Sequence, residues 1–137
     1  MKKKIVILGN SSGTPTLIEA IRANDQDSDI TIVSPDGQLP YDRNLLPALM
    51  AKEVTSAKAL VKNTDFYAKN KVQSILGKKV TKINFRKNQV TIEEKELILD
   101  YDVLVVSSLP ERKLPDIKGV NKVGIFALDQ LAAVDQF

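Results

Sequence analysis

Cysteine, histidine and tryptophan are all absent from the 137 residues of this chain. Without cysteine the chain can form no disulfide, thiolate nucleophile or iron–sulfur ligand set, and without histidine it lacks the usual neutral-pH base and the commonest metal ligand. These absences exclude His-dependent catalytic triads and zinc sites within this chain. Aromatic residues make up only 5% of the sequence, so few side chains could stack on nucleic-acid bases.

Long apolar runs are also lacking, since none approaches the roughly 18 residues that a membrane span requires. The N-terminal lysines resemble the start of a signal peptide, but the apolar stretch at residues 5–8 is too short for its hydrophobic region. With 43% hydrophobic and 27% charged residues, the composition is that of one globular domain. The net charge of +3 comes from interleaved signs. We therefore expect a cytoplasmic protein that binds neither membrane nor nucleic acid.

The first third of the chain has the pattern of a β-α-β unit. Residues 3–8 form a β-branched run that enters a glycine, and a helical spacing of apolar residues follows. Thr14 before Pro15 predicts the helix start, with the threonine hydroxyl as its cap. Residues 30–34 form a second strand. Such a short unit requires parallel strands, which places the turn after the first strand at the carboxyl edge of the sheet, where these folds bind ligands.

Further along, the apolar period changes from that of helices to that of strands. The fold class is therefore α/β, a Rossmann-like three-layer parallel sheet with an attached antiparallel β-meander, in a single domain over residues 1–137. The remaining expected elements are a helix near 45–51, a helix at 65–70 capped by Thr64, parallel strands at 72–75 and 103–107, the meander at 79–100, and a last short helix after Asp129.

The turn after the first strand, Gly9-Asn10-Ser11-Ser12-Gly13-Thr14, matches two motifs. As G-x-S-x-G it has the form of a hydrolase nucleophile elbow, but the serine would have no histidine as its base. As the dinucleotide fingerprint G-x-G-x-x-G it keeps only the first glycine in register, because Ser11 and Thr14 replace the second and third. The helix N-terminus still offers amides and hydroxyls to an anion.

The order of segments resembles a known family. Residues 39–46 (LPYDRNLL) are similar to its loop P-Y-x-R-P-x-L-S-K, residues 64–67 (TDFY) to its D-F-Y stretch, and residues 101–106 (YDVLVV) to its Y-D-x-L-[IV]-[IV] strand. With residues 3–22 and the start of the meander at 80–83, the likeness covers nearly the whole chain. The chain resembles the N-terminal FAD-binding segment of the FAD-dependent pyridine nucleotide-disulfide oxidoreductases, in the branch of rubredoxin, ferredoxin and nitrite reductases.

The resemblance assigns cofactor-binding roles but no catalytic residue and no metal ligand. It places the FAD pyrophosphate on Gly9, Asn10, Ser11, Ser12, Gly13 and Thr14, the ribose on Asp36, the phosphate or flavin side on Arg43, adenine on the Val80 backbone, and the later FAD crossover on Ser107 and Ser108. Each residue also has a structural alternative: the hydroxyls cap a helix, the two charges are solvated, Val80 lies in the core, and the two serines end a strand.

The departures from the family pattern leave two hypotheses open. Besides the lost glycines, the family's A-T-G after the Y-D strand is Ser107-Ser108-Leu109, and the loop lysine is missing. Relative to the family, the domain is incomplete. The first hypothesis is a truncated FAD-binding domain of a flavin-dependent NAD(P)H oxidoreductase that binds FAD weakly, meets NAD(P)H only if further domains exist, and is inactive alone. The second is a degenerate Rossmann-like interaction or regulatory module that has lost FAD. Either would favour self-association or a partner chain that completes the flavin domain.

Overall fold

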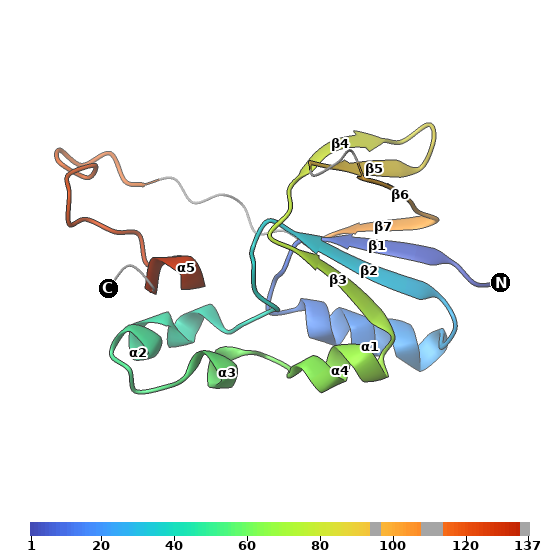
Figure 1. The fold of residues 1–137 in the computed structure, drawn as a ribbon, viewed down its shortest axis with the longest axis horizontal. Helices are drawn as coiled ribbons and strands as arrows, with labels where there is room; N and C mark the ends of the chain where they lie inside the picture. The colour runs from blue at the N-terminus through green and yellow to red at the C-terminus, as the bar shows by residue number, and fades with distance from the viewer. Residues whose placement is uncertain (94–96, 108–113, 135–137) are drawn as a thin grey trace.

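The structure is a computed structural model that describes residues 1–93, 97–107 and 114–134. The chain forms two sheets and a set of helices (Figure 1). The strands are β1 (Lys4–Leu8), β2 (Asp29–Ser34), β3 (Val72–Leu76), β4 (Val80–Asn84), β5 (Gln89–Ile92), β6 (Leu97–Asp100) and β7 (Val103–Val106). The helices are α1 (Thr14–Asn24), a 3-10 turn (Arg43–Leu45), α2 (Leu46–Met50), α3 (Ser56–Ala59), α4 (Thr64–Lys69) and α5 (Leu131–Val134).

The larger sheet is parallel and has the strand order β3-β2-β1-β7. Ile5 of β1 pairs with Ile30 of β2 on one side and with Val103 of β7 on the other. The predicted strands and their parallel pairing are thus confirmed. Because β1 is central, its carboxyl end lies between the ends of β2 and β7, and the turn that follows it meets both.

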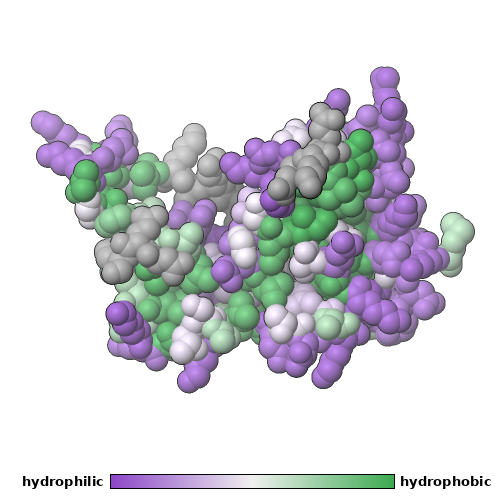
Figure 2. Space-filling view, in the orientation of Figure 1, coloured by the Kyte–Doolittle hydropathy of each residue, from purple (hydrophilic) through white to green (hydrophobic). Residues whose placement is uncertain are grey.

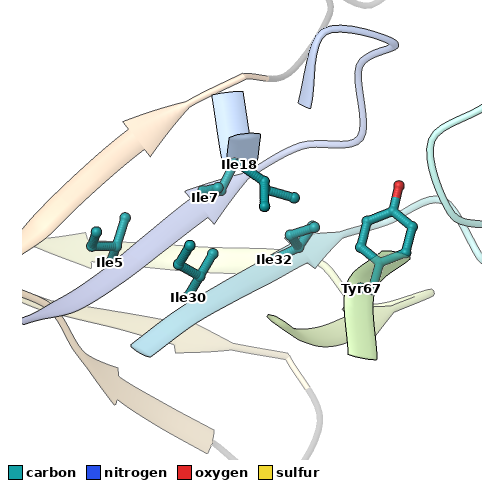
Figure 3. Packing of buried hydrophobic residues seen from close by; sticks show 6 residues of the cluster. All are labelled: Ile5, Ile7, Ile18, Ile30, Ile32 and Tyr67. Carbon is teal, nitrogen blue, oxygen red and sulfur yellow. The ribbon is translucent and has the colours of Figure 1, made fainter. Parts of the chain in front are cut away.

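Alternating side chains of β1 build two cores, one on each face of the sheet. Ile5 and Ile7 pack with Ile18 of α1 and with Tyr67 of α4 (Figure 3). Val6 and Leu8 face the opposite way and pack in a second cluster. The other buried members of this cluster are Val33 of β2, Val90 and Ile92 of the meander, and Tyr101. The three layers are therefore helices, parallel sheet and the antiparallel sheet β4-β5-β6, as Figure 1 shows.

Residues 114–134 run away from the parallel sheet and return to the helical side of the molecule (Figure 1). Here Leu131 of α5 is buried against Tyr41, Leu46 and Leu49, and it joins a third core around α2. The predicted last helix is thus present. Within the described part of the chain, no helix combines the length and the apolar character needed to cross a membrane.

Two predicted helix caps are wrong. Thr14 is the first residue of α1 rather than its cap; Gly13 precedes the helix, and no side chain caps it. The Thr14 hydroxyl lies instead near the end of β7, as described below. Thr64 likewise lies inside α4, because Asn63 supplies the cap: its Oδ1 accepts a hydrogen bond from the Phe66 amide at 3.1 Å. The asparagine one residue upstream competes successfully for the capping position.

Removing the hydroxyl group should have opposite effects on stability at two buried tyrosines. The Tyr67 hydroxyl finds no hydrogen-bond partner among the described residues, and burial raises its pKa to about 12. The Tyr41 hydroxyl accepts a hydrogen bond from the Leu131 amide at 3.1 Å. An unsatisfied buried hydroxyl costs free energy, whereas removing an acceptor strands its donor at a cost of about 1–3 kcal/mol. Urea unfolding should therefore show Tyr67→Phe as stable as the parent or more so, and Tyr41→Phe as less stable. Equal losses in both variants would contradict this assignment.

Candidate functional site

The turn between β1 and α1 begins at a glycine that the backbone requires. Gly9 has a φ of +111°, a conformation that side-chain-bearing residues rarely adopt. Its amide donates to the Val33 carbonyl at 2.8 Å, which fastens the turn to the end of β2. Gly9 is buried, so the sharp exit of the chain from the sheet is fixed at this residue.

Three hydroxyl groups meet beside this turn. The Ser11 and Ser107 Oγ atoms lie 2.8 Å apart, and Thr14 Oγ1 lies 3.4 Å from each of them. Ser11 and Ser107 are half-buried, while Thr14 is fully buried. We call Ser11, Thr14 and Ser107 the hydroxyl cluster. It joins the turn after β1 to the residue after β7. The sequence analysis had assigned these two places to separate contacts with FAD.

The backbone of the same turn carries amide groups that could donate hydrogen bonds to a ligand. Among the described residues, the amides of Ser11, Ser12 and Gly13 have no hydrogen-bond partner. Ser12 and Gly13 are exposed, and both stand at the N-terminus of the 11-residue helix α1. Unpaired amides together with the positive end of a helix dipole favour an anion. The turn can therefore hold a phosphate group through its backbone.

The loop after β2 lies against the turn. The Asn10 Nδ2 amide donates to the Gln38 carbonyl, and Asn10 Oδ1 is buried without a partner among the described residues. At the start of this loop, Asp36 is held through its backbone, because its amide donates to Ser34 Oγ at 3.1 Å. The carbonyl of Asp36 accepts from the Gly77 amide at 2.9 Å. The loop that carries the predicted ribose ligand is thus fixed next to the turn.

Asp36 and Arg43 both lie near the Tyr41 hydroxyl. Burial raises the pKa of Tyr41, and the Asp36 carboxylate raises it further through its charge and a hydrogen bond. Arg43 acts in the opposite direction; its guanidinium carbon lies 5.8 Å from the centre of the Tyr41 ring. Tyr41 therefore connects these two predicted site residues, a role that the sequence analysis missed. The signal for it was the tyrosine within the LPYDRNLL loop.

Arg43 is only partly available to a ligand. Its Nη1 donates to the Asp129 carbonyl at 3.1 Å. Arg43, Asn44 and Asp129 line an open cavity of about 260 Å³ beside α2. Within the described chain no hydrogen bond or ion pair joins Arg43 to residues 9–14, so Arg43 forms a second polar group, apart from the hydroxyl cluster.

Of the last two predicted site residues, Val80 and Ser108, the structure describes only Val80. Val80 begins β4, pairs with Ile92 and packs beside the meander core. The connection that precedes Val80 is bonded to the end of β2, just before the loop that carries the predicted ribose ligand, since the Lys78 amide donates to the Ser34 carbonyl at 3.0 Å. Ser108 lies outside the described residues. Over residues 1–93, 97–107 and 114–134, the acidic side chains form no group of three that could hold a metal ion.

Comparison with known proteins decides the family. Residues 3–137 match the family described as pyridine nucleotide-disulphide oxidoreductase. The chain belongs to this family. As a pyridine nucleotide-disulphide oxidoreductase chain, it has the α/β Rossmann-like fold of an FAD/NAD(P)-binding oxidoreductase domain.

Several members of the family are similar over most of this chain. The NADH-rubredoxin oxidoreductase of Clostridium acetobutylicum is 32% identical over 105 residues, which cover 77% of this chain and 27% of that protein. The epsilon subunit of an NADH-dependent phenylglyoxylate dehydrogenase from Aromatoleum evansii is 26% identical over 93% of this chain and 30% of its own length. The chain therefore spans about a third of these relatives.

Solved structures support the same fold. The reductase in the covalent putidaredoxin reductase–putidaredoxin complex superposes with a TM-score of 0.72 at 28% identity, covering 82% of this chain and 27% of that one. Reduced CoADR-RHD of Bacillus anthracis, at 21% identity, has a TM-score of 0.85 over 99% of this chain and 26% of its own.

Proposed function

We propose that this chain is the FAD-binding domain of a flavin-dependent NAD(P)H oxidoreductase, and that it is not catalytic by itself. The observation that carries the proposal is that the amides of the exposed residues Ser12 and Gly13, at the N-terminus of α1 and in the turn that begins at the positive-φ Gly9, make no hydrogen bond among the described residues. This arrangement fits the anionic diphosphate of a dinucleotide. The family to which the chain belongs supports FAD as that dinucleotide.

The residues present fit the adenosine half of FAD in a defined order. Ser11, Ser12 and Gly13 would bind the diphosphate through their amides. Asp36, two residues after β2, would accept a hydrogen bond from the ribose, and the backbone near Val80 would lie beside adenine. Thr14 has no part in ligand contact in this proposal, because its side chain is fully buried. FAD, when bound, supplies the group that accepts a hydride from NAD(P)H.

The proposal that the chain is inactive alone rests on its share of the relatives and on its residues. Hydride transfer requires the nicotinamide to lie against the flavin in a fixed geometry, which the protein supplies. The chain covers about 30% of the length of relatives that are named as NADH-dependent dehydrogenase or NADH-rubredoxin oxidoreductase proteins. It also has neither cysteine nor histidine to relay electrons or protons. We infer that a nicotinamide site needs additional polypeptide.

The test of FAD binding is a titration of the purified chain. We expect FAD to bind weakly, with quenching of flavin fluorescence on addition of protein, and ADP to compete with it because both carry the diphosphate. Riboflavin, which lacks the diphosphate and adenosine, should neither compete nor bind. A colourless protein that quenches no added FAD would contradict the proposed function.

A second candidate function, an interaction module without FAD, is favoured by one surface. Leu97 and Ile98 of β6 and Val103 and Val106 of β7 are exposed, with Val106 at 66%. Figure 2 shows apolar residues gathered over this part of the molecule. β7 is also an edge strand of the parallel sheet and carries neither lysine nor proline to protect it. This surface would bind a second copy or a partner chain that completes the flavin domain.

A further inference from the structure

We propose that Ser107 is a positioning residue that keeps the Ser11 side chain out of the path by which a diphosphate reaches the turn. This inference rests on the proposed function and deepens it. The two positions lie 96 residues apart in the sequence. Both are positions at which the chain differs from the family pattern that it resembles, Ser11 at the second fingerprint glycine and Ser107 at the alanine of A-T-G.

The geometry of the hydroxyl cluster carries the inference. The 2.8 Å separation of the Ser11 and Ser107 oxygens is that of a good hydroxyl hydrogen bond. The two 3.4 Å distances to Thr14 are longer and weaker contacts. Ser107 therefore provides the main restraint on the Ser11 rotamer, while the buried Thr14 closes the cluster on the side of the helix.

The backbone anchors both partners in this contact. The Ser107 amide donates to the Leu8 carbonyl at 2.7 Å, so Ser107 is held against the end of β1. On the other side, the Ser11 carbonyl accepts from the Thr14 amide at 3.0 Å, which shapes the turn. With both backbones fixed, the hydroxyl contact selects one staggered rotamer of Ser11.

The consequence concerns the amides that would bind the ligand. A hydroxyl directed at Ser107 cannot at the same time project from the turn toward solvent, where the Ser12 and Gly13 residues are exposed. The second fingerprint glycine lets the backbone approach the pyrophosphate closely, so a side chain at this position obstructs that approach. The hydroxyl cluster reduces that obstruction, because it turns the one flexible atom of Ser11 toward the protein.

The experiment is a double-mutant cycle on FAD affinity in the full chain. We expect Ser107→Ala to weaken FAD binding by about three- to tenfold, since Ser11 is then free to sample rotamers that block the turn. In a Ser11→Gly background, Ser107→Ala should have no effect, because the obstructing atom is gone. Ser107→Thr, which retains a hydroxyl, should restore affinity. An equal effect of Ser107→Ala in both backgrounds, or none in either, would overturn the proposal.

A matched control separates positioning from a general loss of stability. Ser28 is a buried serine whose Oγ accepts from the Lys3 amide at 2.9 Å at the opposite edge of the sheet. Ser28→Ala should lower the melting temperature and leave FAD affinity unchanged. If it weakens FAD binding as much as Ser107→Ala does, the effect is one of stability and the proposal fails.

A measurement without ligand keeps this inference separate from the proposed function. NMR couplings between the Ser11 α and β protons should report one rotamer in the parent chain and averaged rotamers in Ser107→Ala. If the parent chain binds no FAD, the proposed function fails, whereas the couplings still decide whether Ser107 positions Ser11. Identical couplings in the two proteins would overturn the inference even if FAD binds.

Discussion

Gly13→Asp should stabilise the fold and at the same time weaken FAD binding by about 10- to 100-fold. Gly13 precedes α1 with a φ of −80°, so a side chain is not strained there. A Cβ added at this position would meet only Ser11 Oγ, at the ordinary contact distance of 3.7 Å. Aspartate is a better helix cap than glycine by a few tenths of a kcal/mol. The substitution is therefore tolerated by the structure.

The loss of binding follows from charge. The added carboxylate would stand at the same amides that are proposed to hold the diphosphate. Like charges at about 4 Å repel by about 4 kcal/mol at an effective dielectric constant of 20, and salt reduces this value. Gly13→Asn is the matched control, because it has the same shape, caps the helix as well, and adds no charge. A fluorescence titration in which both variants bind FAD equally would show that the diphosphate lies elsewhere.

The second large effect is an absence of turnover. The chain with added FAD should oxidise neither NADH nor NADPH faster than free FAD does with the same electron acceptor. The ligands that we propose for FAD are Ser11–Gly13, Asp36 and the backbone near Val80, which would hold its diphosphate and adenosine, and we propose none for the nicotinamide. Under this proposal the nicotinamide would have no fixed place against the flavin, and the chain would not supply the positioning that accelerates hydride transfer.

The assay follows absorbance of the reduced nucleotide at a fixed FAD concentration, with and without protein. Gly13→Asp serves as a control here as well, since any activity that depends on bound FAD should fall with affinity. Turnover well above the free-FAD rate, lost in Gly13→Asp, would show that this one domain assembles a working site, and the proposal that it needs additional polypeptide would be wrong.

The sequence was sufficient for the positions of the strands of the larger sheet and for their parallel pairing. Ile5, Ile7 and their alternating neighbours are apolar on both faces, which is the pattern of a central parallel strand. The change to period two after Gly77 identified the meander. It did not show that the meander packs on the sheet as the third layer, because that contact joins Val90 and Ile92 to β1 across the fold.

The candidate site was predicted less completely, since its contacts are long-range. Each hydroxyl of the cluster was identified as a separate cofactor ligand or helix cap, and Thr14 was wrongly placed as the cap. Only the structure shows that Ser11 and Ser107 satisfy one another. The link from Asn10 to Gln38 likewise depends on how the turn after β1 meets the loop after β2 at the carboxyl edge. Motif spacing carries no information on such contacts.

The most direct test of the account is NMR mapping of the diphosphate on the turn. Titration of ¹⁵N-labelled chain with ADP and with FAD should shift the amide signals of Ser11, Ser12 and Gly13 in both cases, and those of the Gly37–Gln38 loop alongside them. The hairpin at Lys87 and Asn88, between β4 and β5, serves as an internal reference and should not move. Shifts centred on the turn would support the proposed site. Saturable shifts that bypass residues 11–13, or none at millimolar ligand, would contradict it.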